Sequence, residues 1–256
     1  MSRPGHPAAT DERERRGHAV LDLASRDLKA IKIARLIGAH SAQPSRRMLE
    51  IGTGSGGIAH YFGTAGAMAW DVDAIDVEDV RLVSEGFRFT KVDGVVLPFA
   101  DDSFDVVVSN HVIEHVGDDG QQVRHLQEFA RVMRPGGIGY LAVPSRWMLV
   151  EPHYKLPFLS WLPQPLADAY VRLAGKGSHY DCRPMTTREL ESKLRDAGFA
   201  FVQRHGDALR LTYELERPDA AIYRWLLKPI PDGAYALLRR AFPTLIYTVK
   251  LAAKAR

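Results

Sequence analysis

Four glycines close together give this chain the spacing that a nucleotide-binding turn requires. The turn, residues 52–57, reads Gly-Thr-Gly-Ser-Gly-Gly and follows the apolar run 48–51, which predicts a buried strand. Residues 58–62 can begin a helix. Glycine permits positive φ, and the missing Cβ lets a ligand lie against the backbone. Strand, glycine turn and helix N-terminus in this order predict the phosphate or nucleotide cradle of an α/β fold.

The glycines alone leave two classes of ligand open. Gly52, Gly54 and Gly57 satisfy the pattern G-x-G-x-x-G, which is the fingerprint of dinucleotide-binding folds. Glu50 stands two residues before the first glycine, and we expect it to face the mouth of the pocket. A carboxylate there would repel a pyrophosphate but would suit a ligand that carries an ammonium and a sulfonium group. S-adenosylmethionine is such a ligand.

At this point the sequence resembles the class I S-adenosylmethionine-dependent methyltransferases. Their first motif is an acidic residue, any residue, then G-x-G-x-G, and residues 50–56 match it completely. The segment 97–105, Leu-Pro-Phe-Ala-Asp-Asp-Ser-Phe-Asp, resembles the family's L-P-F-x-D-x-S-F-D closely, and 114–116 resembles its E-H-V. Dinucleotide dehydrogenases have no reason to carry these segments. The resemblance covers about residues 45–215.

Two further carboxylates complete the expected cofactor site. Asp76 ends the second predicted strand about 22 residues after Gly54, the spacing at which an acid reaches ribose hydroxyls in dinucleotide folds. Asp71 and Asp73 stay open as alternatives. The resemblance implies that Asp93 accepts a hydrogen bond from the adenine amine. The cofactor site predicted in this way contains Glu50, Gly52, Thr53, Gly54, Ser55, Asp76, Val77, Asp93, Gly94 and Asn110.

Two histidines are candidates for catalysis. Methyl transfer from a sulfonium needs mainly positioning, and a base is required only when the acceptor loses a proton. His111 follows the fourth predicted strand and is the first candidate, and His153 beside Tyr154 is the second. We interpret Glu114 and His115 as structural. The Cys/His and carboxylate residues lack metal-ligand spacing in the sequence, so the sequence predicts no metal.

The residues that follow the fourth predicted strand bear on which kind of molecule accepts the methyl group. Residues 110–112 read Asn-His-Val, which differs from the Asn/Asp-Pro-Pro-aromatic motif of enzymes that methylate planar amino groups. We therefore expect no nucleic-acid substrate and favour a small-molecule acceptor. An RNA or protein methyltransferase stays open as an alternative. A binding module that keeps the cofactor fold without catalysis is another.

The amino-acid composition limits the fold class and the cellular compartment that we expect for this protein. The 256 residues are 46% hydrophobic, carry a formal net charge of +3 and include one cysteine, Cys182. This suits an α/β core in a reducing compartment, without a disulfide framework. The polar start predicts no secretion signal, and no apolar run approaches the ~20 residues of a spanning helix. We expect a cytoplasmic protein.

The elements that position these residues alternate between strand and helix. The predicted strands are 47–51, about 67–75, 87–92, 106–109, 138–143, 199–204 and 209–215, the last two as an antiparallel hairpin. Helices are predicted at about 18–40, after Asp118 or Asp119, and after a capping box of Thr186 and Glu189. The pattern predicts a doubly wound, mostly parallel seven-stranded sheet, with a methyltransferase domain over 18–216.

Three segments fall outside this alternation. Residues 1–17 are predicted as a flexible tail. The proline-rich, aromatic stretch of about 145–184, with a short helix at 166–173, is predicted as an apolar lid. Residues 217–256 hold eight cations against two acids, interleaved with aromatic residues, and we expect a basic helical extension. This extension would either contact a membrane surface and bring the enzyme to a hydrophobic or lipid-linked acceptor, or pack on the domain or a second subunit.

Overall fold

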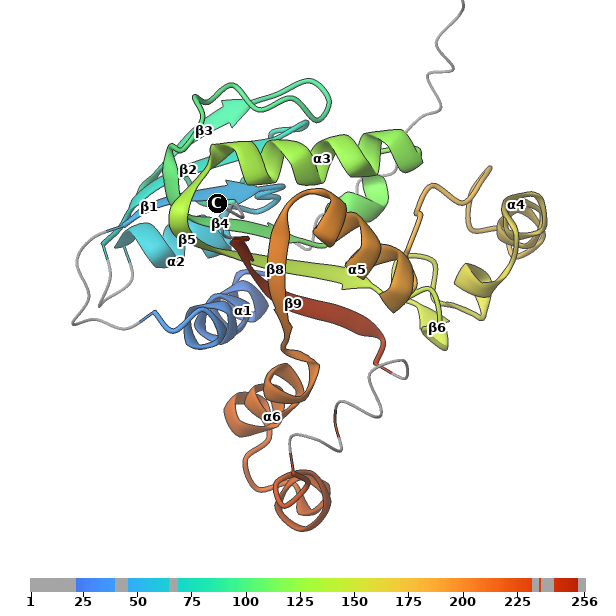
Figure 1. Cartoon of the computed structure of the whole chain (residues 1–256). Coiled ribbons are helices and arrows are strands. Elements are labelled where there is room, and N and C mark those ends of the chain that lie inside the picture. Colours follow the sequence, from blue (N-terminus) through green and yellow to red (C-terminus); the bar gives the residue numbers. More distant parts are fainter. Residues whose placement is uncertain (1–21, 40–45, 65–68, 232–234, 236–241, 253–256) are drawn as a thin grey trace, which may run out of the picture.

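A seven-stranded sheet organises the chain. In the computed structural model, which describes residues 22–39, 46–64, 69–231, 235 and 242–252, the strand order is β3-β2-β1-β4-β5-β9-β8. The first five strands in this order run parallel, and β9 is antiparallel to both of its neighbours (Figure 1). The strands of this sheet are β1 (Arg47–Ile51), β2 (Asp71–Asp76), β3 (Phe87–Lys91), β4 (Phe104–Asn110), β5 (Met133–Pro144), β8 (Phe199–Gln203) and β9 (Thr244–Leu251). The predicted fold class is confirmed.

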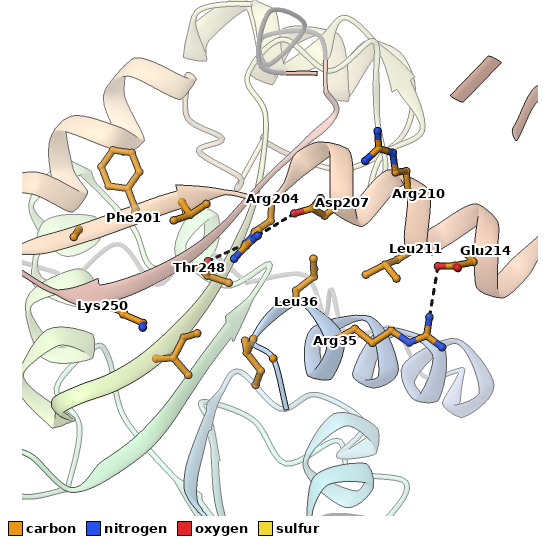
Figure 2. Close-up of a pocket in the computed structure, with 15 residues that line it drawn as sticks. Arg35, Leu36, Phe201, Arg204, Asp207, Arg210, Leu211, Glu214, Thr248 and Lys250 are labelled. Atoms are coloured by element: carbon orange, nitrogen blue, oxygen red, sulfur yellow. Dashed lines mark hydrogen bonds and ion pairs between the residues drawn. The ribbon is translucent and has the colours of Figure 1, made fainter. Parts of the chain in front are cut away.

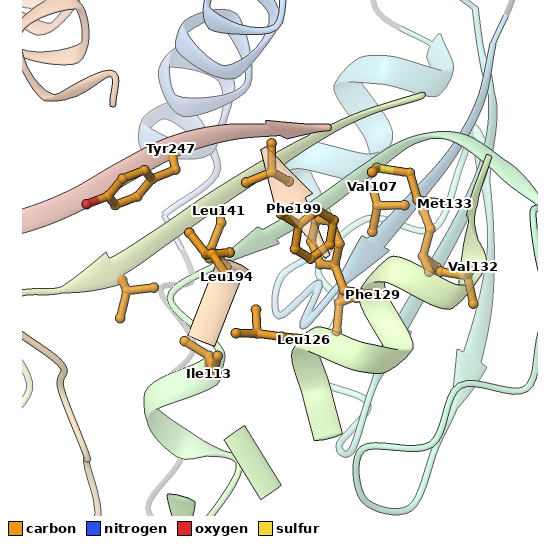
Figure 3. Packing of buried hydrophobic residues seen from close by; sticks show 14 of the residues in the cluster. Val107, Ile113, Leu126, Phe129, Val132, Met133, Leu141, Leu194, Phe199 and Tyr247 are labelled. Atoms are coloured by element: carbon orange, nitrogen blue, oxygen red, sulfur yellow. The ribbon is translucent and has the colours of Figure 1, made fainter. Parts of the chain in front are cut away.

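Helices cover both faces of the sheet (Figure 1). On one face α3 and α5 pack against the strands, with Leu126, Phe129, Leu194 and Phe199 in one buried cluster (Figure 3). On the other face α1, α2 and α6 form a second cluster. The helices are α1 (Leu23–Leu36), α2 (Gly57–Thr64), α3 (Asp119–Val132), α4 (Gln164–Leu173), α5 (Thr187–Asp196) and α6 (His205–Glu216), with the short turns η1 (Ile113–His115), η2 (Leu159–Trp161) and the π-helical η3 (Tyr223–Leu227).

Local signals placed most helix starts correctly. The Asp118 side chain accepts a hydrogen bond from the Gln121 N–H at 2.9 Å and caps α3. Thr186 and Glu189 form both hydrogen bonds of the predicted capping box at the start of α5. Each cap satisfies backbone donors that would otherwise lack a partner, which is why these residue types fix a helix start.

The predicted final hairpin is wrong. Residues 209–215 lie in α6, and β9, from the predicted basic extension, supplies the last strand. Leu245 and Tyr247 are fully buried and Val249 is 1% exposed, because β9 inserts between β5 and β8. The sheet therefore extends past residue 216, the predicted end of the domain, and residues 244–251 belong to the core. The predicted tail at 1–17 lies outside the described residues.

Residues 145–184, called the insertion from here on, form a small unit of their own. They contain the hairpin of β6 (Val150–Glu151) and β7 (Leu156–Pro157), then η2 and α4. A separate apolar cluster holds them together, with Tyr154, Leu159, Val171 and Cys182 buried. The predicted short helix lies within α4.

No helix among the described residues has the length and apolar composition needed to cross a bilayer.

Candidate functional site

The glycine turn follows β1 at the carboxyl edge of the parallel strands. The Gly52 N–H donates to the Ile75 carbonyl at 2.8 Å, which ties the turn to the end of β2. Gly52 has φ +75°, and a Cβ there would lie 2.4 Å from the Val112 side chain. Gly56 has φ +84°, and a Cβ there would meet the Val83 carbonyl at 2.6 Å. At these two positions only glycine fits, since larger residues would be both strained and obstructed.

The acidic residues lie at the ends of adjacent strands, as predicted. Asp76 ends β2, and its Oδ2 accepts a hydrogen bond from the Gly54 N–H at 2.8 Å. The Val92 N–H donates to the Asp76 carbonyl at 2.9 Å, so the exposed Asp93 follows β3 close by. Asp71 begins β2 at the opposite edge of the sheet, and Asp73 lies mid-strand against Arg88. Of the three acids considered for β2, only Asp76 reaches the turn.

Glu50 does not face the mouth of the pocket. It is 2% exposed, and its Oε2 accepts hydrogen bonds from the Thr53 hydroxyl at 2.8 Å and the Ala59 N–H at 2.9 Å. Burial raises the pKa of Glu50 to about 8, although these hydrogen bonds oppose the shift. The Glu50 side chain therefore links β1 to the glycine turn and to the N-terminal end of α2. It supports the site from the protein interior and does not line the pocket.

Two buried polar atoms beside the turn are left without a hydrogen-bond partner among the described residues. They are Oδ1 of Asn110, the last residue of β4, and Oγ of Ser55 in the turn itself. Asn110 lies one residue beyond Ser109, which pairs with Ile51 across β1 and β4. A buried acceptor without a partner costs free energy unless a ligand or water satisfies it. Asn110 and Ser55 are both among the residues predicted to bind the cofactor.

Arg26 was missed by sequence reasoning. It belongs to α1, and a Cβ on Gly57 would lie 2.6 Å from the Arg26 Cβ, so the helix packs directly against the turn. Burial lowers the pKa of Arg26, while the nearby Glu50 opposes that shift. The periodicity of α1 predicted only a packed helix, and nothing in it distinguishes Arg26 from the other cations on that helix.

Glu114 lies against two histidines, the candidate His111 and its neighbour His115. His111 follows β4 with φ +59°, a left-handed conformation that costs energy for a non-glycine residue. Its Nδ1 lies 3.4 Å from Oε1 of the fully buried Glu114, and Nε2 of His115 lies 3.8 Å from the same oxygen. Despite its burial, Glu114 has a lowered pKa because of these histidines. Glu114 therefore holds a buried negative charge against two imidazoles.

His153 reaches this neighbourhood from the insertion. Its ring centroid is 5.2 Å from that of His115, in an edge-to-face arrangement. The buried Cys182 completes the group, with Sγ 3.7 Å from Nδ1 of His115. One ligand-type atom from each of His115, His153 and Cys182 lies within 4.8 Å of the others. The fold brings this cluster together from three distant parts of the chain, so no sequence spacing could reveal it.

The 97–105 segment has a structural explanation. Arg131 of α3 donates to the carbonyls of Leu97 at 3.0 Å and Phe99 at 2.7 Å, and Glu128 accepts from the Leu97 N–H at 2.9 Å. The guanidinium of Arg131 also bonds Asp101 at 2.8 Å. These contacts fix the segment that leads into β4, and through β4 they set the positions of Asn110 and His111.

A cavity lies elsewhere, on the face of the sheet covered by α1 and α6. It encloses about 670 Å³ between these helices, β8 and β9, and none of its lining residues belongs to the glycine turn. Ion pairs Arg35–Glu214 and Arg204–Asp207 cross its rim (Figure 2). The opposite charges on this rim are already paired, so cavity size alone does not identify the functional site here.

Comparison with known proteins agrees with the site. Residues 49–141 match the family described as a methyltransferase domain. An uncharacterized methyltransferase of Mycobacterium leprae is 34% identical over 111 residues, which cover 41% of this chain and 40% of the relative. A ubiquinone biosynthesis O-methyltransferase of Parvibaculum lavamentivorans is 29% identical over 166 residues, 59% and 58% of the two chains. The chain thus spans about half the length of these relatives.

Solved structures share the fold over most of this chain. The partner of the Haloferax volcanii Trm112 methyltransferase activator aligns with TM-score 0.55 and 19% identity, covering 90% of this chain and 94% of its own. A phosphoethanolamine N-methyltransferase of Haemonchus contortus, solved with S-adenosyl-L-methionine, aligns with TM-score 0.53, 16% identity and coverages of 88% and 52%. The [4+2]-cyclase SpnF aligns with TM-score 0.53, 17% identity and coverages of 94% and 86%, so the fold alone does not establish methyl transfer. Its sheet, its glycine turn and the match over residues 49–141 together show a methyltransferase-type domain in this part of the chain.

Proposed function

We propose that this chain is an S-adenosylmethionine-dependent methyltransferase acting on a small acceptor with an apolar portion. The observation that carries the proposal is the hydrogen bond from the Gly54 N–H to Asp76, which joins the glycine turn to the acid at the end of the next strand. Asp93 after β3 and the unsatisfied Asn110 Oδ1 at the end of β4 supply polar groups on either side. Calorimetric titration with S-adenosylmethionine tests the binding part of this proposal.

The residues around the turn fit that cofactor. Asp76 would hold the ribose hydroxyls, and Asp93 the adenine amine, because carboxylates accept from both. Asn110 Oδ1 would accept from the ammonium of the methionine part, and Arg26 would face its carboxylate. The polar backbone of residues 52–55 and 94 and the apolar Val77 would line the remainder. When bound, this cofactor supplies a methyl group on an already activated sulfonium.

The chain's own contribution to catalysis would be positioning and proton transfer. His111 is proposed to take the proton of an acceptor hydroxyl, with Glu114 stabilising the imidazolium that forms. Glu114 is buried and its Oε1 lies 3.4 Å from Nδ1 of His111, so it would also fix the orientation of that ring. His153, on the hairpin of the insertion, is proposed to face the acceptor from the opposite side.

The insertion favours an acceptor with an apolar portion. Three aromatic side chains on it touch edge to face and are 40–50% exposed: Trp147, Phe158 and Trp161. Leu149 and Val150 extend this surface at 64% and 54% exposure. A contiguous apolar patch on a protein surface indicates a binding surface, because covering it releases water. We propose that the insertion acts as a lid that packs on the apolar part of the acceptor.

A second exposed surface bears on membrane contact. Of the predicted basic extension, the part at η3 exposes Trp225 and Leu226 at 79% and 56%, beside the cations Arg224 and Lys228. Aromatic and basic side chains of this kind suit the headgroup region of anionic lipid. We therefore propose that any peripheral membrane contact is made by η3, since β9 is part of the sheet.

If the acceptor has an apolar portion, the methylated product should be soluble in organic solvent. Full-length enzyme, methyl-labelled cofactor and a lipid extract dispersed in anionic vesicles should yield label that partitions into the organic phase. Replacing Trp161 by alanine should raise the KM for that acceptor roughly tenfold, the worth of about 1.4 kcal/mol of apolar contact. Leu173→Ala, at an exposed position on α4, is the matched control. Label found only in water-soluble products would contradict the apolar acceptor while leaving methyl transfer intact.

A further inference from the structure

The cluster of His115, His153 and Cys182 contains two residues, His115 and Cys182, that the proposed methyl transfer does not use. Each member comes from a separate part of the fold: His115 from η1 after β4, His153 from the turn between β6 and β7, and Cys182 from the end of the insertion. Imidazole nitrogen and thiolate sulfur are the ligands that zinc prefers, whereas magnesium and calcium prefer oxygen. The donor set therefore selects a borderline transition metal.

We propose that His115, His153 and Cys182 bind a zinc ion at the base of the insertion. Two ligands of one tetrahedral zinc lie about 3.3–3.6 Å apart, given metal–nitrogen and metal–sulfur bonds of about 2.0 and 2.3 Å. The Cys182 Sγ and the His115 Nδ1 are already 3.7 Å apart. All three ligand atoms lie within 4.8 Å of one another, so side-chain shifts of about 1 Å, well within rotamer wells, would complete the geometry.

The surroundings of His115 match those of a metal-bound histidine. With Nδ1 directed at Cys182, the opposite ring nitrogen, Nε2, lies 3.8 Å from the buried carboxylate of Glu114. Metal-ligating histidines usually present their second nitrogen to a carboxylate, which fixes the tautomer and strengthens the ligand. Glu114 would thus serve both the proposed base His111 and the proposed metal ligand His115.

Hydrogen bonds hold the other two ligands in place. Glu151 accepts from the Tyr154 N–H at 2.7 Å and, through its carbonyl, from the Lys155 N–H at 2.8 Å, which closes the turn that carries His153. The Tyr154 hydroxyl donates to Asp181 at 2.8 Å, next to Cys182. The Arg183 N–H donates to the Glu114 carbonyl at 2.8 Å and ties this segment to η1. The ligands are therefore positioned by the fold before any ion arrives.

Charge favours a cation at this place. The carboxylates of Glu151, Asp181 and Glu114 place a negative field at the Cys182 thiol. The same negative field attracts a divalent cation. Zinc would bind the sulfur as thiolate, with the thiol proton released to solvent. Asp181, whose Oδ1 accepts from the Cys182 thiol at 3.5 Å, can supply a fourth ligand, or that position can hold water.

Cobalt substitution tests the site directly, independently of cofactor binding and of methyl transfer. Full-length protein is stripped with a chelator and titrated with Co²⁺, then with Zn²⁺. We expect one ion per chain, tetrahedral visible bands, and a near-ultraviolet thiolate-to-cobalt band that zinc abolishes. Because Cys182 is the chain's one cysteine, that band reports this site alone.

Substitutions of the proposed ligands test whether these residues bind zinc or only pack against one another. Cys182→Ser should abolish the thiolate band, and His153→Ala should weaken zinc binding at least about 10–100-fold, the loss known for even the outer partners of metal ligands. His179→Ala is the matched control, because its ring bonds Ser178 on the same insertion. Circular dichroism in chelator establishes that each variant is folded. A folded wild type that shows no thiolate band, or equal zinc affinity in wild type and His153→Ala, would overturn the proposal.

Discussion

A chain truncated after residue 243 is expected to lose its cooperative fold. The truncation removes β9, which pairs with β5 on one side and β8 on the other. It also removes Leu245, Tyr247 and Val249 from the core. At roughly 1.5–3 kcal/mol for each buried side chain, the loss is about 5–9 kcal/mol. That is comparable to the whole stability of an ordinary domain, about 5–15 kcal/mol.

Thermal unfolding followed by circular dichroism measures this effect. The matched control is a chain truncated after residue 252, which keeps β9 and should melt as the full chain does. A chain ending at residue 243 that still melts cooperatively near the wild-type temperature would show that β9 is dispensable. Both truncated chains keep η3, so the experiment tests the contribution of β9 to the fold separately from any membrane contact.

Replacing His111 by alanine is expected to lower turnover by about 10²–10⁴-fold, the usual contribution of a general base. The affinity for S-adenosylmethionine should change little, because the contact proposed for His111 is to the acceptor. The left-handed backbone at His111 and the buried Glu114 at 3.4 Å support a functional role, since both carry a cost in stability.

Single-turnover kinetics with saturating cofactor measures the effect. His60→Ala, at a half-buried position on α2, is the control for loss of a histidine elsewhere in the domain. A wild-type pH–rate profile should show a limb, assigned to a base, that disappears in His111→Ala. If the variant turns over at the wild-type rate with an unchanged profile, His111 only supports the structure.

The parts of the site that were predicted correctly depend on neighbours in the sequence. The glycine turn, the acid that ends β2 and the capping box of α5 each require particular residue types within a few positions, so local chemistry identifies them. Glu50 was predicted by type but not by orientation. Its spacing from Gly52 was informative, yet hydrogen bonds to Thr53 and Ala59 turn its side chain inward.

The parts that sequence reasoning missed depend on tertiary contacts. Residues 209–215 alternate apolar and polar side chains, which favours a strand, but they lie in α6 because β9 fills the place between β5 and β8. The sequence predicted β9 as part of a basic helical extension because cations are frequent over residues 217–256, although β9 itself contains only Lys250. The cluster around His115 likewise exists only when the insertion folds back onto η1.

Calorimetric titration of the full-length protein with S-adenosylmethionine tests the central claim most directly. We expect one site per chain, and we expect Asp76→Ala to weaken binding by roughly 1–3 kcal/mol, the worth of hydrogen bonds to a charged acceptor. Asp71→Ala, at the opposite end of the same strand, is the matched control and should bind as the wild type does. Tight binding of a nicotinamide dinucleotide in place of S-adenosylmethionine, or equal affinity in wild type and a folded Asp76→Ala, would contradict the assignment.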